Sequence, residues 1–279
     1  MYRIVRKERL HDTVSLIEVE APYVARKALP GQFIVLRIDE KGERIPLTIA
    51  DYDREKGTAT VIFQKVGATT KLDLLEEGDY LMDFAGPLGK ASEFDHLKGK
   101  KAAVVAGGLG VAIAYPQAKA LNAIGADVDA FIGFRSTSLY ILTEEFKSAC
   151  KNLYIMTDDG SNGHKGFVTS ALEEQLKAGT RYDEVFVLGP MPMMRAVCNL
   201  TKEYGIKTTV SMNTIMIDGT GMCGGCRLTG ETKFACVDGP DFDGHLVDFD
   251  EAIMRSRMYK AEEKLSDEKH FCHLIGGER

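Results

Sequence analysis

The sequence predicts an antiparallel β-barrel, then an α/β domain on a doubly wound parallel sheet, then a short glycine- and cysteine-rich segment. Three observations support this order. The first hundred residues alternate short β-rich runs with turns, apolar runs alternate with helical stretches beyond Gly99, and three of the six cysteines fall within 223–236. We therefore expect units at 1–98, 99–210 and 211–279.

The composition of the chain narrows the classes of function that it can have. The 279 residues carry 35 Lys and Arg against 41 Asp and Glu, a net charge of −6. Proteins that bind nucleic acid through its phosphates normally carry a basic excess or stripe, which is missing here. The longest uncharged stretch, 102–118, is short for a bilayer span, and the first ten residues lack the apolar core of a signal peptide. We expect no nucleic-acid partner, no membrane association and a cytoplasmic location.

The barrel is expected from regularly spaced short strands. Turn signals such as Pro30-Gly31 and Gly86-Pro87-Leu88-Gly89 separate them. This punctuation is typical of small antiparallel barrels. The expected strands are Val14–Glu20, Gln32–Ile38, Arg44–Ala50, Thr58–Gln64 and Tyr80–Phe84.

The α/β domain is expected from continuous apolar runs, which indicate strands buried on both faces. Helical stretches between them make the sheet parallel and doubly wound. The expected strands are Ala102–Ala106, Ala130–Phe134, Leu153–Thr157 and Val185–Leu188, and the expected helices span 111–124, 142–149, 168–178 and 192–204. A polar helix is expected to start near Asp250, which can cap its free N–H groups.

Three loops of the α/β domain carry signals for a nucleotide. Each follows an apolar run, and two open a helix, whose free N–H groups and partial positive charge attract phosphate. Ligands of open α/β sheets gather at the carboxyl ends of strands, so we expect the loops to converge on one edge. The candidate residues are Gly107, Gly108, Gly110, Asp158, Gly189, Pro190 and Met193. A plain strand–helix turn is the alternative for each loop.

Arg135 ends the next apolar run after the glycine turn, where ribose recognition is usually decided. An arginine at this point can hold the 2′-phosphate of NADP. The alternative is a surface arginine without a ligand, so NAD and NADP both stay open.

A second set of candidates lies in the barrel, in Arg44-Ile45-Pro46-Leu47-Thr48. Arginine can pair with a pyrophosphate through two directed hydrogen bonds, and Thr48 can donate a hydroxyl to a ring or phosphate. Pro46 fixes the backbone and removes one N–H group. From these residues alone, a strand with a charged edge is as good an interpretation as a ligand site.

The sharpest signal is Asp218, Cys223 and Cys226, followed by Cys236. The gaps of four and two residues match the plant-type ferredoxin spacing, with an aspartate where the first cysteine is expected. Glycines between them let backbone N–H groups approach the sulfides of an iron–sulfur cluster. The alternatives are a structural zinc that uses the three cysteines and His245, or free cysteines in a loop.

Taken together, these motifs resemble the ferredoxin–NADP reductase superfamily. Arg44 to Thr48 is similar to its R-x-P-[LYF]-[ST] flavin signature, in which the arginine meets the FAD pyrophosphate and the hydroxyl residue meets the isoalloxazine. The resemblance also implies pyrophosphate contacts from Gly67 and Thr70, and it implies that the glycine turns hold a nicotinamide nucleotide. The last segment resembles the electron-transfer subunit of dihydroorotate dehydrogenase, which adds a 2Fe–2S cluster.

The aspartate at 218 departs from that subunit, which supplies four cysteines. With Asp218 the segment resembles the small subunits of NADH-dependent ferredoxin:NADP oxidoreductases. That resemblance implies a relay between NAD(H), with NADP(H) as the other candidate, FAD and a 2Fe–2S cluster, with no catalytic side chain of its own. It also implies an electron-bifurcating heterodimer, in which a larger subunit carries a second FAD and two 4Fe–4S clusters and serves ferredoxin.

Two other functions compete with this interpretation. One is an electron-transfer subunit of an NAD-dependent dihydroorotate dehydrogenase. The other is a zinc-stabilised nucleotide-binding protein without redox activity. The role of Cys272, which lies between His270 and His273, is left unassigned.

Overall fold

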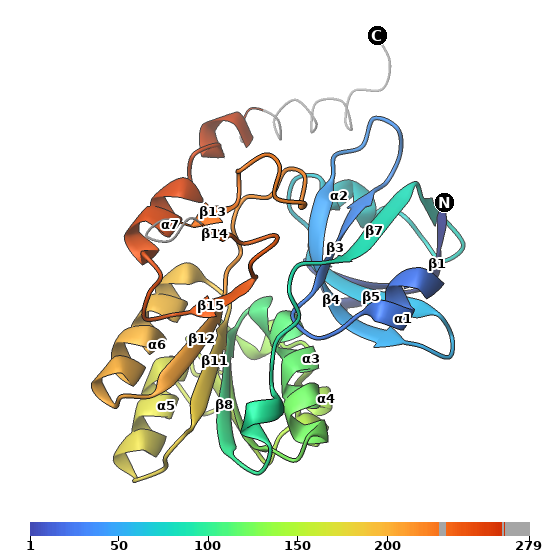
Figure 1. The fold of residues 1–279 in the computed structure, drawn as a ribbon. Helices are drawn as coiled ribbons and strands as arrows, with labels where there is room; N and C mark the ends of the chain where they lie inside the picture. Colours follow the sequence, from blue (N-terminus) through green and yellow to red (C-terminus); the bar gives the residue numbers. More distant parts are fainter. Residues whose placement is uncertain (229–232, 264, 266–279) are drawn as a thin grey trace.

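A computed structural model of the chain describes residues 1–228, 233–263 and 265. In Figure 1 the barrel lies at the upper right and the α/β domain at the lower left, and the C-terminal segment lies above the latter and faces the barrel. The expected fold class is confirmed. Among the described residues, no helix is both long enough and apolar enough to cross a membrane.

The barrel is one antiparallel sheet. Within the described residues its seven strands follow the order β6-β1-β2-β5-β4-β3-β7. The two end strands, β6 and β7, are nearly consecutive in the chain, so the sheet curls round on itself. The strands are β1 (Tyr2–His11), β2 (Val14–Glu20), β3 (Phe33–Arg37), β4 (Ile45–Asp53), β5 (Thr58–Gln64), β6 (Tyr80–Leu81) and β7 (Asp83–Leu88), with short helices α1 (Pro22–Lys27) and α2 (Thr69–Leu72).

Two barrel expectations need correction. The expected strand Tyr80–Phe84 divides at Met82 into β6 and β7, and Gly86 to Leu88, expected as a turn, is extended within β7. Strand β1 is missing from the sequence prediction, because most of its side chains are exposed or half-buried and Ile4 is its one fully buried residue. A strand with so little apolar periodicity leaves almost no signal.

The second sheet is parallel apart from one edge strand. Its order is β10-β9-β8-β11-β12-β15, and β15 pairs antiparallel with β12. This confirms the doubly wound prediction and adds β12 and β15, which it lacked. The strands are β8 (Lys101–Gly107), β9 (Asp127–Phe134), β10 (Asn152–Thr157), β11 (Glu184–Leu188), β12 (Lys207–Ser211) and β15 (Asp241–Asp243).

Helices cover both faces of this sheet (Figure 1). Apolar side chains of α3 and α4 pack on one face, and those of α5 and α6 pack on the other. The bounds are α3 (Gly110–Ala123), α4 (Thr143–Ala149), α5 (Val168–Lys177) and α6 (Met191–Glu203), with 3₁₀ turns at Asp95–Leu97 and Thr137–Leu139.

The C-terminal segment is built onto the α/β domain. It adds β15 to the sheet, and the buried Phe249 and Ala252 of α7 (Phe249–Arg255) join the core on the α6 side. A small hairpin, β13 (Arg227–Leu228) with β14 (Lys233–Phe234), precedes them. The helix expected near Asp250 is capped by Asp248 instead, whose Oδ1 accepts the Glu251 N–H at 3.0 Å.

The order of the sheet reverses beside β8, whose neighbours are β9 and β11. At this point the two chain segments approach very closely. A Cβ placed on Gly110 would lie 2.3 Å from the Leu188 carbonyl oxygen, and one on Gly189, where φ is +148°, would lie 3.0 Å from the Gly107 oxygen. Glycine is therefore required for the glycine turn to pack against the end of β11.

We predict that Gly110→Ala lowers the free energy of unfolding by about 2 kcal/mol or more, because backbone atoms cannot move aside cheaply. Chemical denaturation measures the loss. Gly125→Ala is the control: its φ of +82° is unfavourable to alanine, but no atom lies within 4 Å of the added Cβ. A Gly110 variant no less stable than the control contradicts the predicted close packing.

Candidate functional site

The predicted nucleotide loops meet at one edge of the parallel sheet. Strands β8 to β11 all end there, and backbone hydrogen bonds join their loops: Gly108 N–H to Gly133 O at 2.9 Å and Asp158 N–H to Phe134 O at 3.0 Å. Helices α3 and α6 begin at the same edge. The helix dipoles therefore give this edge a positive partial charge.

The predicted residues differ in exposure. Gly107 is buried against Met193, whose Sδ would lie 2.7 Å from a Cβ at that glycine. Gly108 and Pro190 are exposed, as are Arg135 and Asp158 on the neighbouring loops. Since the polar residues stay open to solvent and the glycines admit close approach, the edge can receive an extended phosphate ligand.

An open hollow lies between the barrel and this edge. Pro46, Leu47 and Thr48 of β4 line it on the barrel side. Further lining on the barrel side comes from β3, β4 and β5, and the rest comes from the start of α3, from β12 and the segment after it, and from the residue before β15. These residues are Phe33, Ala50, Ile62, Leu109, Ala112, Ile113, Ser211, Met212, Asn213, Met216 and Pro240. A mostly apolar hollow with a few hydroxyl and amide groups suits a planar heteroaromatic ligand.

The other barrel candidates lie outside this lining. Arg44 is exposed just before β4, and Gly67 and Thr70 belong to the turn that opens α2, where Thr70 N–H donates to Gly67 O at 3.0 Å. Sequence reasoning overlooked Thr69, whose hydroxyl accepts the Val66 N–H at 2.9 Å and shapes this loop.

Cys226 and Cys236 form the buried half of the predicted metal site. Their Sγ atoms lie 3.2 Å apart on either side of the β13–β14 hairpin. Both belong to an apolar cluster with Phe33 and Val35 of β3. Burial, and then the adjacent Cys226 thiol, raise the pKa of Cys236 to about 12.

The half-buried Asp218 and the exposed Cys223 form the more open half. The Asp218 carboxylate accepts the backbone N–H groups of Thr220 and Cys223, both at 2.7 Å, and these bonds hold its pKa below the usual value. The Cys223 Sγ accepts the Gly225 N–H at 3.4 Å. The carboxylate is therefore ionised and tied to the same loop as the cysteines.

The donor set fits a two-iron cluster. Three sulfurs and one carboxylate lie on one loop and its hairpin, and backbone N–H groups already point at a carboxylate and a sulfur. Within the part of the chain that is described, however, no three of these side chains are close enough to hold one metal ion. A two-iron cluster divides its four ligands between two metals, so it does not require three of them around one ion.

The zinc alternative needs His245, and the structure engages that residue elsewhere. Its Nε2 lies 3.2 Å from Thr201 Oγ1 on α6, and its N–H donates to Asp243 at 2.9 Å. His245 therefore anchors the C-terminal segment to the α/β domain. The Cys272 thiol and its flanking histidines lie outside the described residues.

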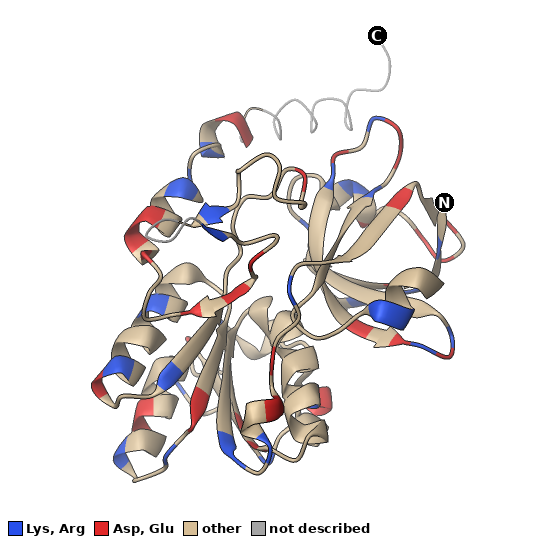
Figure 2. Cartoon of the chain, in the orientation of Figure 1, with Lys and Arg blue, Asp and Glu red and all other residues tan. Residues whose placement is uncertain are grey.

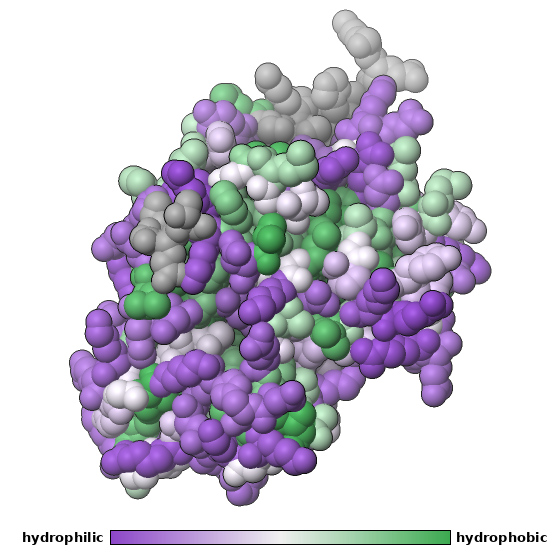
Figure 3. All heavy atoms as spheres, in the orientation of Figure 1, coloured by the Kyte–Doolittle hydropathy of each residue, from purple (hydrophilic) through white to green (hydrophobic). Residues whose placement is uncertain are grey.

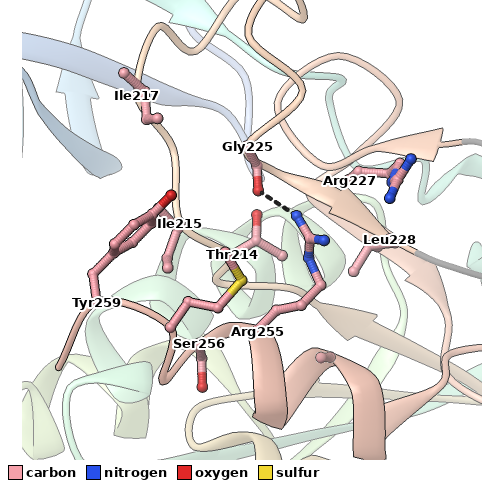
Figure 4. Close-up of a pocket in the computed structure, with 11 residues that line it drawn as sticks. Thr214, Ile215, Ile217, Gly225, Arg227, Leu228, Arg255, Ser256 and Tyr259 are labelled. Carbon is pink, nitrogen blue, oxygen red and sulfur yellow. Dashed lines mark hydrogen bonds between the residues drawn. The ribbon is translucent and has the colours of Figure 1, made fainter. Parts of the chain in front are cut away.

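A second, smaller hollow lies between the cysteine loop and α7 (Figure 4). On one side of it, the Arg255 guanidinium donates to the Gly225 carbonyl at 3.2 Å. This bond ties α7 to the stretch between two of the candidate ligands. Sequence reasoning missed Arg255, because a contact across 30 positions has no local signature.

The large hollow and the cysteine pair share a wall. Phe33 and Met216 line the hollow and also pack in the cluster that contains Cys226 and Cys236. Phe33 stands opposite Thr48 in the β3–β4 register. One layer of side chains thus separates the flavin-type motif from the sulfur atoms.

This arrangement of barrel, nucleotide edge and cysteine loop defines an electron-transfer subunit of a ferredoxin reductase-like oxidoreductase. Residues 213–248 match the iron–sulfur cluster binding domain of dihydroorotate dehydrogenase B. A homologue of that enzyme's NAD⁺-dependent electron-transfer subunit in Thermotoga maritima is 42% identical, over 95% of this chain and 94% of its own. The chain belongs to the family of these electron-transfer subunits and their homologues.

Two further relatives extend the comparison. An uncharacterised protein from Clostridium beijerinckii is 52% identical over 99% of this chain and 98% of its own length. A solved structure of an NADH-dependent reduced ferredoxin-NADP oxidoreductase, studied for flavin-based electron bifurcation, is 40% identical. It superposes with a TM-score of 0.89 over 97% of this chain and 98% of that one.

We predict that Arg255→Ala speeds iron loss to a chelator roughly tenfold, because a hydrogen bond from a charged donor contributes about 1.5 kcal/mol or more. Absorbance at fixed chelator concentration follows the loss. Arg257→Ala, at an exposed position just past α7, is the control. Equal rates for both variants exclude a role of Arg255 in holding the loop.

Proposed function

We propose that the chain is the NAD-side electron-transfer subunit of an electron-bifurcating, NADH-dependent ferredoxin:NADP oxidoreductase. Its cofactors are FAD, a 2Fe–2S cluster and NAD(H). The observation that carries the proposal is the shared wall of Phe33 and Met216, since it sets the flavin-type motif beside the cysteines. When bound, FAD exchanges two electrons with the nicotinamide as hydride and the cluster carries them one at a time.

In this proposal, residues 1–98 hold the FAD. Arg44 pairs with the pyrophosphate and Gly67 and Thr70 contact it from the α2 loop. The β4 residues Pro46, Leu47 and Thr48, which line the hollow, orient the ring. The apolar lining around them excludes water from the reacting edge.

Residues 99–210 hold the nicotinamide nucleotide. Gly107, Gly108 and Gly110 let its pyrophosphate approach the start of α3, where the positive end of the helix dipole favours anions. The turn after β11, with Gly189, Pro190 and Met193, forms the opposite side of this site. On the adjoining loops, Arg135 and Asp158 face the ribose and decide between NAD and NADP.

Residues 211–279 carry the cluster, with Asp218, Cys223, Cys226 and Cys236 as its ligands. Two features support this set: the buried sulfur pair is already in contact, and the Asp218 carboxylate is already ionised. A carboxylate replaces a thiolate at equal formal charge but is a harder, less covalent donor.

A larger subunit completes the enzyme as a heterodimer, and we place the complex in the cytoplasm. In this scheme that subunit carries a second FAD and 4Fe–4S clusters and serves ferredoxin. Large apolar side chains are exposed around the cysteine loop and α7, which favours a protein partner there. They are Ile217, Met222, Val237, Leu246, Met254, Met258 and Tyr259. Figure 3 shows green apolar atoms reaching the surface on this side, and Figure 2 shows acidic and basic residues interspersed around the molecule.

A second candidate function is electron transfer to dihydroorotate dehydrogenase. The match of residues 213–248 favours it, as does a 32% identical electron-transfer subunit from Fusobacterium nucleatum, which covers 80% of this chain. Asp218 favours the first proposal, because the resemblance to the dihydroorotate dehydrogenase subunits implies four cysteines and this chain has an aspartate at the first of these positions.

The experiment that tests the proposal is anaerobic affinity purification of the native protein. We expect a larger flavin- and iron-containing subunit to co-purify and the complex to reduce NADP⁺ with NADH and reduced ferredoxin. Recovery of a dihydroorotate-oxidising partner instead selects the second candidate. A colourless protein that contains zinc contradicts both.

We predict that Arg44→Ala weakens FAD binding roughly tenfold or more, since a charge-assisted, two-pronged contact with the pyrophosphate is lost. Flavin content after dialysis measures retention. Lys41→Ala removes a positive charge from the same loop and is expected to keep its flavin. Equal flavin in both variants removes Arg44 from the pyrophosphate site.

We predict that Asp218→Ala loses much of the cluster, whereas Asp218→Cys keeps it with altered spectra, because cysteine restores a fourth thiolate. Electron paramagnetic resonance of the reduced protein distinguishes the two. Asp238→Asn, which removes a charge at an exposed position of the same segment and keeps an oxygen to accept the Phe234 N–H, is the control. Spectra unchanged in both Asp218 variants show that another group is the fourth ligand.

A further inference from the structure

A buried carboxyl group, that of Asp241, lies just behind the wall of the large hollow. Asp241 begins β15, the short strand labelled in Figure 1, and stands opposite Ser211 of β12. Ser211 and Pro240 both line the hollow. Because opposed residues of an antiparallel pair place their side chains on one face, the carboxyl reaches the Ser211 side chain directly.

Groups from three parts of the chain meet at this carboxyl. The Ser92 hydroxyl, from the connection between the barrel and the α/β domain, donates to Oδ2. The amide of Gln117, a buried polar residue of α3, donates to the same oxygen at 3.4 Å. Oδ1 is shielded from solvent and meets no well-aligned hydrogen-bond partner among the described residues.

The charges around Asp241 oppose its ionisation. Glu184 of β11, another acid, acts on it, and Glu184 itself contacts His96 and Lys207 at 2.7 and 3.0 Å. Burial raises the pKa of Asp241, and the hydroxyls of Ser92 and Ser211 and the Gln117 amide only partly offset this. Because two donors already point at Oδ2, Oδ1 is the oxygen that would hold the proton of the neutral acid.

We propose that Asp241 is a positioning residue that sets the redox potential of the bound flavin through its own proton. In the resting protein it is a neutral acid that holds Ser211 and Pro240 against the hollow. Loss of its proton puts a negative charge behind the ring and makes reduction of the flavin less favourable. The inference rests on the proposed function, because it requires the flavin to occupy this hollow.

Electrostatic repulsion explains why the charge on Asp241 affects reduction of the flavin. When a dihydronicotinamide gives up hydride, its C–H bond breaks, an N–H bond forms on the acceptor ring, and one negative charge remains in the hollow. An ionised carboxylate nearby opposes that charge, whereas a neutral acid does not. By reciprocity, flavin reduction and retention of the Asp241 proton favour each other to the same extent.

The test compares the flavin midpoint potential of wild type and Asp241→Asn by spectroelectrochemistry from about pH 5 to about pH 9, the range in which buried carboxyls ionise. Asparagine has the same shape and stays neutral. We expect the two potentials to run parallel at low pH and the wild-type potential to fall below the variant's as Asp241 ionises. A tenfold coupling corresponds to a fall of about 30 mV for a two-electron couple.

Two further variants make the test specific. Asp243→Asn makes the same chemical change at an exposed position of the same strand, and its potential is expected to follow wild type at every pH. Ser92→Ala removes a donor that favours the charged form, so the step is expected at higher pH. Ser92→Ala also provides the test if the Asn variant does not fold.

The outcomes distinguish a failure of this inference from a failure of the proposed function on which it rests. Flavin content is measured first, and a wild-type protein that binds no FAD overturns the proposed function and this inference with it. Bound FAD with a constant difference between wild type and Asp241→Asn overturns the inference alone. A step that also appears in the Asp243 variant assigns the effect to surface charge and likewise overturns it.

Discussion

The packing of the cysteine pair against barrel strand β3 is the contact on which the rest of the site depends. Cys226 and Cys236 are almost fully buried there, at 1% and 2% exposure, in a cluster with Phe33 and Val35. Strand β3 pairs with β4, so whatever packs on β3 lies beside the flavin-type motif. The loop that carries these cysteines lies more than 150 positions away in the chain. It is thereby separated from the large hollow by one layer of side chains.

That contact is possible because the C-terminal segment packs against both the α/β domain and the barrel. Strand β15 extends the α/β sheet, α7 packs beside α6, and the intervening loop packs on the barrel. The hydrogen bonds among Ser92, Gln117 and Asp241 lie where these parts meet. This segment therefore joins the barrel and the nucleotide edge, which also contact each other directly where Ala50 and Ile62 of the barrel pack in one core with α3.

Much of this fold could be read from local patterns. Local patterns predicted helices α3 to α6 to within one residue at each end, and strands β2 and β5 to the residue. The failures share a physical cause. Strand β1 has a single buried residue, β15 has three residues, and the cap of α7 depends on backbone angles that place Asp248, not Asp250, before the first turn. None of these leaves a periodic apolar signal.

Sequence and tertiary structure likewise determined different features of the candidate site. Sequence alone determined the chemistry, because the spacing of Asp218 and the cysteines, the β4 motif and the glycine turns are each local and need particular side chains at particular intervals. Only the tertiary structure determined which residues surround these motifs. The positions of Phe33, Met216, Asp241 and Arg255 follow from strand register and domain packing, which sum many weak contacts between distant residues and therefore leave no trace in any single stretch of sequence.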